Sequence, residues 1–245
     1  MNKILVEINN LSLIYKNKNI LDNINFKIYE GDKIALIGTN GSGKSSLISV
    51  LNGTRKSING EIKIFNKSLT QLQNKQKINI GTIWQDLRLI DELSAEQNVN
   101  CGLLGRNNFL FAIKNLLNIC SFEKAHKCMK LFLLNENLFD KNIEKLSGGE
   151  KQRIAIARSI IQEPNILFAD EPFNNLDPKI SIYIKDLLLS RKNKFHIKIP
   201  NTQLISIHRL DLLRGFNKVM GIKNGRIIFI LNTNQLKKYH LKKIY

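Results

Sequence analysis

Apolar and polar residues alternate along the first third of the chain, and this pattern predicts strands. The runs "ILVEINNLSLIY" and "NINFKIYEGDKIALIG" combine the alternation with many β-branched residues. The second run ends in Lys33–Ile37, which we expect to be a buried strand. The following segment "KSSLISVLNG" has helical spacing, whereas "GEIKIFN" and "INIGTIWQ" return to the strand pattern.

From about Leu87 to Lys145 the apolar residues recur at helical spacing and the strand-like runs disappear. This change predicts a helical insertion. The rest of the chain alternates again, with helices expected at "EKQRIAIARSIIQ" and "PKISIYIKDLLLS" and strands at "NILFAD", "TQLISIH" and around "KVMGIKNGRIIFIL". Strands that alternate with helices predict an α/β fold with a mainly parallel sheet covered on both faces.

Length and composition agree with one large α/β domain that carries an insertion, because the chain has 245 residues of which 43% are hydrophobic. The three cysteines form no C-x-x-C pair. They therefore argue against a disulfide framework and fit a reducing compartment. His126 and Cys128 lack two further ligands at metal spacing, so we expect packing or surface cysteines. No apolar run has the length of a membrane-spanning helix. Lysine and glutamate interrupt the N-terminal segment, so we do not expect it to be a signal peptide.

The formal net charge of +18 admits two interpretations. A nucleic-acid partner or an anionic bilayer would explain it physically. The alternative is a compositional bias, since lysine, asparagine and isoleucine are abundant throughout and the basic residues are scattered, apart from the tail "LKKYHLKKIY". The scatter favours the compositional interpretation.

The stretch "GTNGSGKSS" matches the phosphate-binding pattern G-x-x-x-x-G-K-[ST] and stands between a predicted strand and a predicted helix. Glycines allow backbone N–H groups to surround a phosphate, and the helix N-terminus adds partial positive charge. We expect Lys44 to reach the β- and γ-phosphates and the Ser45 hydroxyl to bind Mg²⁺. A glycine-rich turn with an incidental lysine is the alternative. The predicted ATP-binding residues of this loop are Gly38, Thr39, Asn40, Gly41, Ser42, Gly43, Lys44, Ser45 and Ser46.

A pair of acids follows the apolar strand of "ILFADEP". Asp170 is placed to hold hydrated Mg²⁺, and Glu171 is placed to polarise an attacking water. Two acids could instead simply end the strand at the surface. The phosphate loop and the chain-breaking Pro172 favour the catalytic interpretation.

A second glycine pair lies in "LSGGEKQR", Leu146–Arg153, just before a predicted helix. With the phosphate loop and the acidic pair in this order, nearly the whole chain resembles the ATP-binding-cassette (ABC) ATPases. The resemblance implies a P-loop, RecA-like α/β core with an antiparallel β subdomain and an inserted α-helical subdomain that carries the signature. It implies a single ABC ATPase domain, residues 1–245, in which residues 1–86 and 160–235 form the core with the β subdomain, residues 87–159 the helical subdomain and residues 236–245 a basic tail.

The resemblance also assigns roles to residues that carry little information alone. Tyr15 matches the aromatic residue that stacks on adenine, and Gln85 matches the Q-loop glutamine, which contacts Mg²⁺ and the nucleophilic water. His208 matches the switch histidine of the γ-phosphate. "NNLD", Asn174–Asp177, matches the D-loop, although Asn174 stands where a small residue such as serine is common. Asparagine favours turns, so we expect the loop to keep its turn.

In the family two chains meet head to tail around ATP. The resemblance therefore implies a homodimer in which the signature residues Ser147, Gly148, Gly149 and Glu150 of one chain close over the γ-phosphate held by the other. Hydrolysis with Glu171 as the base would loosen this dimer. The implied cofactors are ATP and Mg²⁺, with Ser45, Gln85 and Asp170 at the metal.

The compact length resembles a transporter cassette that works with separate membrane subunits. The runs "WQDLRLIDELSAEQNVNCGLLGR" and "IHRLDLLRGFNKVMGIKNGRIIF" are similar to those of phosphonate-importer ATPases. The methionine, lipoprotein-release and cell-division types stay open, as do a nucleic-acid-associated ATPase and a non-enzymatic switch. We expect a peripheral protein on the cytoplasmic side of the plasma membrane, two permease subunits that dock a helix near 86–106, and an indirect solute-binding protein. Residues that could line the docking groove or belong to the core are Leu87, Leu89, Ile90 and Leu93.

Overall fold

The computed structural model describes residues 3–55, 59–190 and 193–245. The chain divides into two compact units. The first unit comprises Met1–Gln73, Leu167–Glu171 and Asn201–Tyr245, and the second comprises Asn74–Ile166 and Pro172–Pro200. The boundary of the helical subdomain that the resemblance implies, at residues 87 and 159, stays a prediction.

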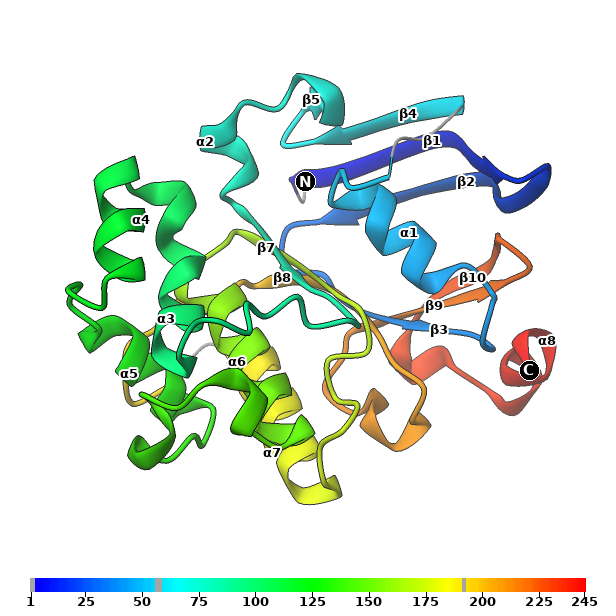
Figure 1. Cartoon of the computed structure of the whole chain (residues 1–245). Helices are drawn as coiled ribbons and strands as arrows, with labels where there is room; N and C mark the ends of the chain where they lie inside the picture. The colour runs from blue at the N-terminus through cyan, green and yellow to red at the C-terminus, as the bar shows by residue number, and fades with distance from the viewer. Residues whose placement is uncertain (1–2, 56–58, 191–192) are drawn as a thin grey trace. The chain divides into compact units, whose positions relative to one another are not determined.

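An antiparallel sheet forms one part of the first unit (Figure 1). Its strands follow the order β2-β1-β4-β5. Alternate residues of β1, among them Val6 and Ile8, are buried, and the polar residues between them are not, as the alternating sequence predicts. The bounds are β1 Ile4–Tyr15, β2 Lys18–Tyr29, β4 Asn59–Ile64 and β5 Lys67–Ser68.

The second sheet of this unit is mainly parallel, in agreement with the prediction. Within the unit its order is β10-β9-β3-β8-β7, and β3 pairs in parallel with both β8 and β9, whereas β10 is antiparallel to β9. Four residues of β3 are fully buried, which explains its apolar run. The bounds are β3 Lys33–Ile37, β7 Ile166–Ala169, β8 Thr202–Ser206, β9 Lys218–Lys223 and β10 Arg226–Asn232.

Helix α1 (Lys44–Leu51) follows β3 after the phosphate loop, as the sequence predicts. The basic C-terminal segment is not an extended tail, because Lys238–Ile244 forms helix α8, which contacts β9 and β10 and buries Ile244. Short 3₁₀ turns complete the unit at η1 Leu69–Gln71, η5 Leu210–Leu213 and η6 Thr233–Gln235.

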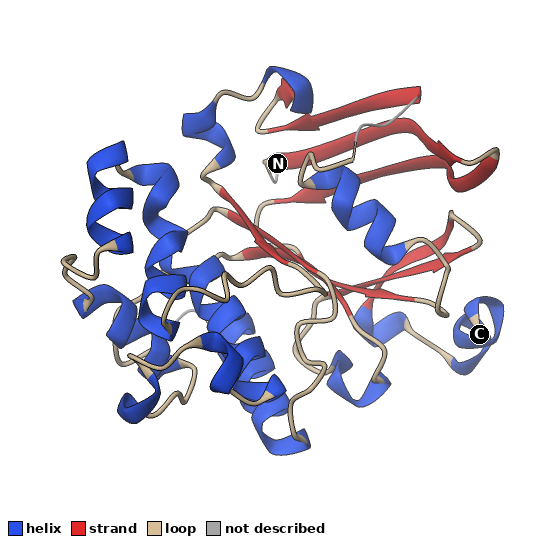
Figure 2. Ribbon diagram, viewed as in Figure 1, coloured by secondary structure: helices blue, strands red, loops and turns tan. Residues whose placement is uncertain are grey.

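The second unit is mostly helical (Figure 2). Helix α6 packs against α3, α5 and β6 and buries Ile154, Ala157 and Ile160 on its apolar side. The long helical run predicted after Leu87 is interrupted by turns. The bounds are α2 Asn74–Lys77, β6 Ile80–Ile83, α3 Ala95–Asn100, η2 Cys101–Arg106, α4 Phe109–Leu116, α5 Glu123–Leu131, η3 Glu136–Leu138, η4 Ile143–Lys145, α6 Gly148–Ile161 and α7 Pro178–Leu189.

Among the described residues, no helix combines the length and the apolar character needed to cross a membrane. Cys128 is buried and its thiol donates to the carbonyl oxygen of Ala157 (3.4 Å), so it packs as a core residue. His126 instead pairs through Nε2 with Glu96 Oε2 (2.6 Å).

Candidate nucleotide-binding and catalytic site

The phosphate loop connects the buried end of β3 to the first turn of α1. Its curvature needs glycine at two points. A Cβ on Gly38 would lie 2.2 Å from the carbonyl oxygen of Ile222, and Gly43, which caps α1, has a φ of 109°. The loop therefore presents backbone N–H groups and the N-terminus of α1 to the same place, which suits an anion.

Lys44 is the first residue of α1, and its side chain folds back over the loop. Its Nζ donates to the carbonyl oxygens of Gly38 (2.9 Å) and Thr39 (3.0 Å). Burial lowers the pKa of the Lys44 ammonium, and the negative charges of Glu171 and Asp170 partly oppose this shift. The phosphate-loop lysine and the acidic pair thus act on one another electrostatically, as the predicted site requires.

Asp170 and Glu171 follow β7 directly, and Ser206 at the end of β8 connects them. The Ser206 hydroxyl donates to Asp170 Oδ1 (2.7 Å) and accepts from the backbone N–H of Glu171 (2.8 Å). Ser206 is fully buried. Sequence reasoning missed this residue, although a serine at the end of a strand, two residues before His208, was a usable signal.

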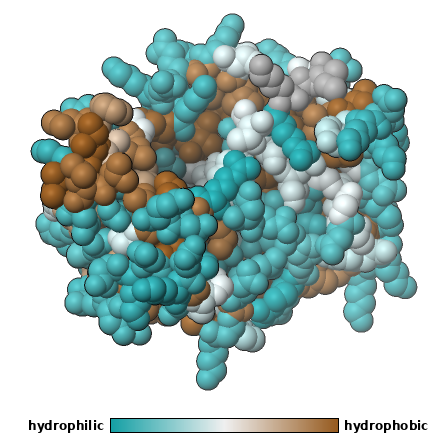
Figure 3. All heavy atoms as spheres, in the orientation of Figure 1, coloured by the Kyte–Doolittle hydropathy of each residue, from teal (hydrophilic) through white to brown (hydrophobic). Residues whose placement is uncertain are grey.

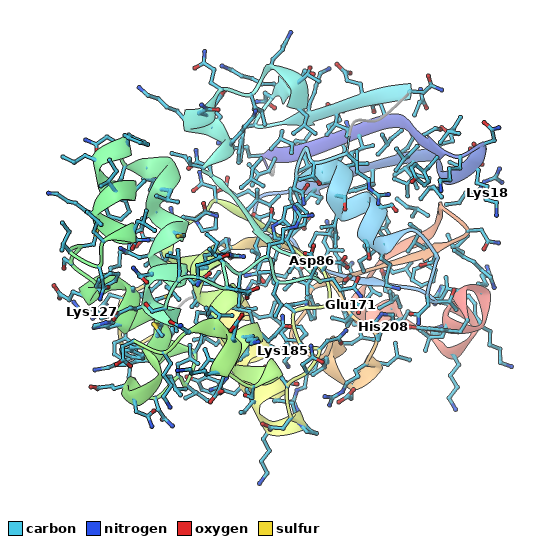
Figure 4. The ribbon with its side chains drawn as sticks, viewed as in Figure 1. Lys18, Asp86, Lys127, Glu171, Lys185 and His208 are labelled. Atoms are coloured by element: carbon cyan, nitrogen blue, oxygen red, sulfur yellow. The ribbon has the colours of Figure 1, made fainter. Side chains whose placement is uncertain are left out.

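Glu171 is held in an unusual conformation beside His208. Its φ is 50°, in the left-handed region that residues other than glycine rarely occupy. Strain of this kind costs on the order of 1–3 kcal/mol and gathers at functional sites. His208 Nε2 is hydrogen-bonded to Glu171 Oε1 (Figure 4), so the predicted base and the predicted switch histidine lie together.

The oxygen atoms of Ser45 and Asp170 fit a hard divalent cation. The side chain of Ser45 is half-buried at the start of α1, and Asp170 supplies a buried carboxylate in the same unit. Hydroxyl and carboxylate oxygens are what Mg²⁺ prefers. The Ser42 hydroxyl inside the loop is buried and makes no hydrogen bond with the described residues. It is therefore available to donate a hydrogen bond to an anion in the loop.

The signature segment begins α6 in the second unit. Ser147 caps this helix: its Oγ accepts from the Glu150 N–H (3.3 Å), while the Ser147 N–H donates to Glu150 Oε2 (2.8 Å). The backbone N–H of Ser147 is the main cause that lowers the pKa of the Glu150 carboxyl, against a smaller opposing effect of burial. The cap leaves Gly148 and Gly149 in the N-terminal turn of a long helix, where Gly148 is exposed and Gly149 is half-buried.

The D-loop lies against the signature within this unit. A Cβ on Gly149 would lie 3.0 Å from the carbonyl oxygen of Asn175. The expected turn is present, and its left-handed residue is Asn175 (φ 60°) rather than Asn174. Asp177 caps α7 by accepting from the Ile180 N–H (2.9 Å). The signature and the D-loop therefore lie close together, at Gly149 and the backbone of Asn175.

Gln85 follows β6 in the second unit, and its side chain is exposed. The loop after it is tied to α6, because the Arg158 guanidinium donates to the carbonyl oxygens of Leu87 and Arg88 (2.5 Å each). Sequence reasoning missed this arginine. Its burial lowers the pKa of the guanidinium. Helix α6, which begins with the signature, therefore also holds the Q-loop through a residue in its C-terminal half.

The remaining predicted residues are divided between surface and core. Tyr15 at the end of β1 is 59% exposed, and the Lys16 ammonium lies 5.6 Å from the centroid of its ring. Of the residues expected to line a docking groove or the core, Leu93 is buried, Ile90 is exposed, and Leu87 and Leu89 are intermediate. The roles of Tyr15 and Gln85 toward a nucleotide stay predictions.

The family model described as ABC transporter matches residues 21–174. The phosphonates import ATP-binding protein PhnC of Fusobacterium nucleatum is 33% identical over 98% of this chain and 98% of its own. The chain belongs to the ABC transporter family. The phosphonates import ATP-binding protein PhnC 1 of a Nostoc species is 34% identical over 99% of this cassette and 92% of its own length.

Solved cassettes confirm the fold. The dimeric structure of MJ0796, titled a bacterial ABC transporter cassette, has a TM-score of 0.80 and 26% identity and covers 95% of this chain and 100% of its own. MJ0796 in a post-hydrolysis state bound to ADP and Pi has a TM-score of 0.78 with 27% identity and the same coverage. The predicted fold class and the prediction of an ATP-binding ATPase are both confirmed.

Proposed function

We propose that this cassette hydrolyses ATP to drive the import of a phosphonate or related phosphorus oxyanion through a separate membrane permease. The observation that carries the proposal is the similarity to phosphonates import ATP-binding proteins along almost the entire chain. The acidic pair, Lys44 and His208 support the catalytic part. The cassette would work as a homodimer at the cytoplasmic side of the plasma membrane, with two permease subunits and an indirect solute-binding protein.

In this mechanism Glu171 accepts the proton of the attacking water. The Ser206 hydrogen bond at its backbone and the His208 contact at its side chain restrict where the carboxylate can lie. Lys44 neutralises phosphate charge from the buried end of the loop. Ser45, Asp170 and Gln85 would hold Mg²⁺, which stabilises the charge of the transferred phosphoryl group when it is bound.

The signature completes the site in trans. Gly148 and Gly149 offer backbone N–H groups at the N-terminus of α6, and the Ser147 hydroxyl stands at the same end. The Glu150 carboxylate caps the helix of its own chain. Its predicted role at the partner's ATP is therefore indirect, because it fixes the shape of this turn. The contact between Gly149 and Asn175 connects the signature to the D-loop. Binding of the γ-phosphate would shift the population toward the closed dimer.

A shape-conserving change that removes the charge of the base tests the catalytic proposal. Glu171→Gln keeps the side-chain shape and a hydrogen-bonding group for His208 but removes the base, so turnover should fall by about 10²–10⁴-fold while ATP binding persists. Size-exclusion chromatography with saturating ATP should then show a dimer. A variant that stays monomeric contradicts the ATP sandwich, and one that keeps its turnover contradicts the role of Glu171.

The in-trans role needs mixed dimers. Ser147→Arg in one copy should impair hydrolysis at the nucleotide held by the other copy. Lys44→Ala in one chain of the mixed dimer restricts hydrolysis to the nucleotide of the other chain, and so identifies which of the two sites is impaired. Impairment at the variant's own nucleotide would contradict the arrangement.

The solute is tested in the native transporter. Lys44→Ala should abolish uptake of the phosphonate class, and unchanged phosphonate uptake together with loss of another solute would assign the cassette to a different importer. Strong, salt-sensitive stimulation of turnover by duplex DNA or RNA would favour the nucleic-acid alternative that the net charge raises.

A further inference from the structure

Helix α4 exposes apolar side chains instead of burying them. Phe109 is 81%, Leu116 is 65% and Ile119, just beyond the helix, is 64% exposed. They gather in the hydrophobic cluster at the upper left of Figure 3, where Figure 1 places α4. Soluble proteins rarely expose contiguous apolar surfaces of this kind without a partner. We define the α4 face as Phe109, Leu110, Ile113, Leu116, Leu117 and Ile119.

The side of α4 that faces the protein is built around a polar residue, and the apolar Phe111 and Ala112 are only half-buried. Asn115 is its one buried residue, and it lies in an amide cluster with two residues of α3. Asn100 Nδ2 donates to Asn115 Oδ1 (3.0 Å), and Gln97 Nε2 donates to the Asn115 carbonyl oxygen (2.7 Å). Asn115 Nδ2 in turn donates to the Gln97 carbonyl oxygen (3.2 Å). Helix α4 thus exposes most of its apolar residues, whereas an ordinary surface helix buries its apolar side.

This exposure is not forced by the sequence pattern alone. A helix with this composition would gain free energy by turning Phe109 and its leucines inward. The amide cluster fixes the opposite orientation, since buried amides must keep their partners. The structure therefore holds the α4 face outward at the expense of apolar burial, and the face must meet a non-aqueous surface to recover it.

The surroundings of the α4 face carry positive charge. The sequence between Glu96 and Glu123 contains no acidic residue but includes Arg106 and Lys114. Helix α2, which like α4 contacts η2, adds the exposed side chains of Lys75 and Lys77. Glu96 itself is buried and paired with His126, so it does not offset this charge.

We propose that the α4 face inserts into the interface of a lipid bilayer with anionic headgroups. Exposed aromatic and aliphatic side chains with lysine and arginine around them are the chemistry of interfacial membrane binding. Lysine side chains can lay their apolar stems along such a surface while their ammonium groups reach the headgroups. A projecting helix also suits a planar surface better than a groove that receives a partner's helix. The contact is additional to the permease contact of the proposed function and does not depend on the solute.

Vesicle binding at constant protein charge tests this proposal. The double variant Phe109→Ser with Leu116→Ser should bind vesicles of equimolar phosphatidylcholine and phosphatidylglycerol at least about tenfold more weakly than the unchanged chain. Its control is Ile182→Ser, an exposed apolar residue of α7 that should leave binding unchanged. Because the net charge attracts any anionic surface, flotation is measured at a salt concentration of roughly 0.5 M, where that attraction is screened.

The charge component has its own control. Lys75→Gln with Lys77→Gln and Lys114→Gln should weaken binding at low salt by about 10-fold or more, whereas Lys179→Gln on α7 should not. Pure phosphatidylcholine vesicles should bind the unchanged chain more weakly than the mixture. Equal binding by all variants overturns the proposal.

Depth of insertion gives an independent measurement. A tryptophan introduced by Phe109→Trp should be quenched by brominated lipids, and one introduced by Ile182→Trp should not. Equal quenching in the two variants overturns the proposal. So does loss of permease capture in detergent by the serine double variant with unchanged vesicle binding, because the α4 face would then bind protein. ATP turnover of the double variant in solution should be unchanged, so these outcomes are distinguishable from failure of the proposed function.

Discussion

Ser206 offers a sharp test of how the catalytic acids are positioned, because one hydroxyl serves both of them. Ser206→Ala removes the 2.7 Å hydrogen bond to Asp170 and leaves the Glu171 N–H without its 2.8 Å partner. A hydrogen bond to a charged group contributes about 1.5–3 kcal/mol, and an unsatisfied buried N–H costs about 1–3 kcal/mol. Since Ser206 is fully buried, we expect a net loss of roughly 2–4 kcal/mol.

For a chain of this size that loss corresponds to a Tm lower by about 5–15 °C in thermal unfolding. ATP turnover should fall at least about tenfold, because Glu171 and Asp170 lose their common support and catalytic geometry is sensitive to small displacements. Ser206→Thr keeps the hydroxyl and should retain most of the turnover.

The matched control is Ser159→Ala. This serine is also buried, but its hydroxyl contacts the neutral carbonyl oxygens of Thr82 (2.6 Å) and Ala155 (3.0 Å) in the second unit. It should lower stability by only about 1 kcal/mol and leave turnover unchanged. The reasoning is refuted if Ser206→Ala resembles Ser159→Ala in both measurements.

Three further predictions concern the second unit. Gly148→Ala should be tolerated or slightly stabilising in thermal unfolding, whereas Gly149→Ala should be less stable than Gly148→Ala, because its Cβ would press on the Asn175 carbonyl at 3.0 Å. The lowered pKa of the Glu150 carboxyl means that its charge stabilises the fold above the ordinary pKa of 4.5, and that this contribution is lost as the pH falls below that value. The Tm difference between the unchanged chain and Glu150→Gln should therefore shrink as the pH falls over that range. A Tm difference that is independent of pH would contradict this prediction. Arg158→Gln removes both guanidinium bonds to the Q-loop, so amide hydrogen exchange of residues 87–88 should accelerate, and unchanged exchange would show that the arginine does not hold the loop.

Much of the site could be predicted because its motifs are local. The strand, glycine loop and helix around Lys44 are set by neighbours in the sequence, and the cap between Ser147 and Glu150 spans a single helical turn. The acidic pair at the end of β7 could likewise be placed from an apolar run and a following proline. Short-range geometry leaves few alternatives for such segments, so residue type and spacing suffice.

Other features depend on contacts between distant segments. Ser206 became part of the site only because β8 ends beside β7, and Arg158 reaches a loop some seventy positions earlier in the chain. The C-terminal "LKKYHLKKIY", predicted as a basic tail, forms a helix because Ile244 finds a buried place against its own unit. Periodicity cannot identify such partners, since any apolar or polar side chain is compatible with several of them.

Helix α4 separates the two kinds of information most clearly. The sequence alone determined that "NNFLFAIKNLLN" is helical and that Phe109, Ile113 and Leu116 share one side. Only the tertiary structure decided that this side faces outward, because the buried amides of Gln97 and Asn100 on α3 donate hydrogen bonds to Asn115. A helical period specifies which residues lie together, but the direction in which they point is chosen by what packs against them.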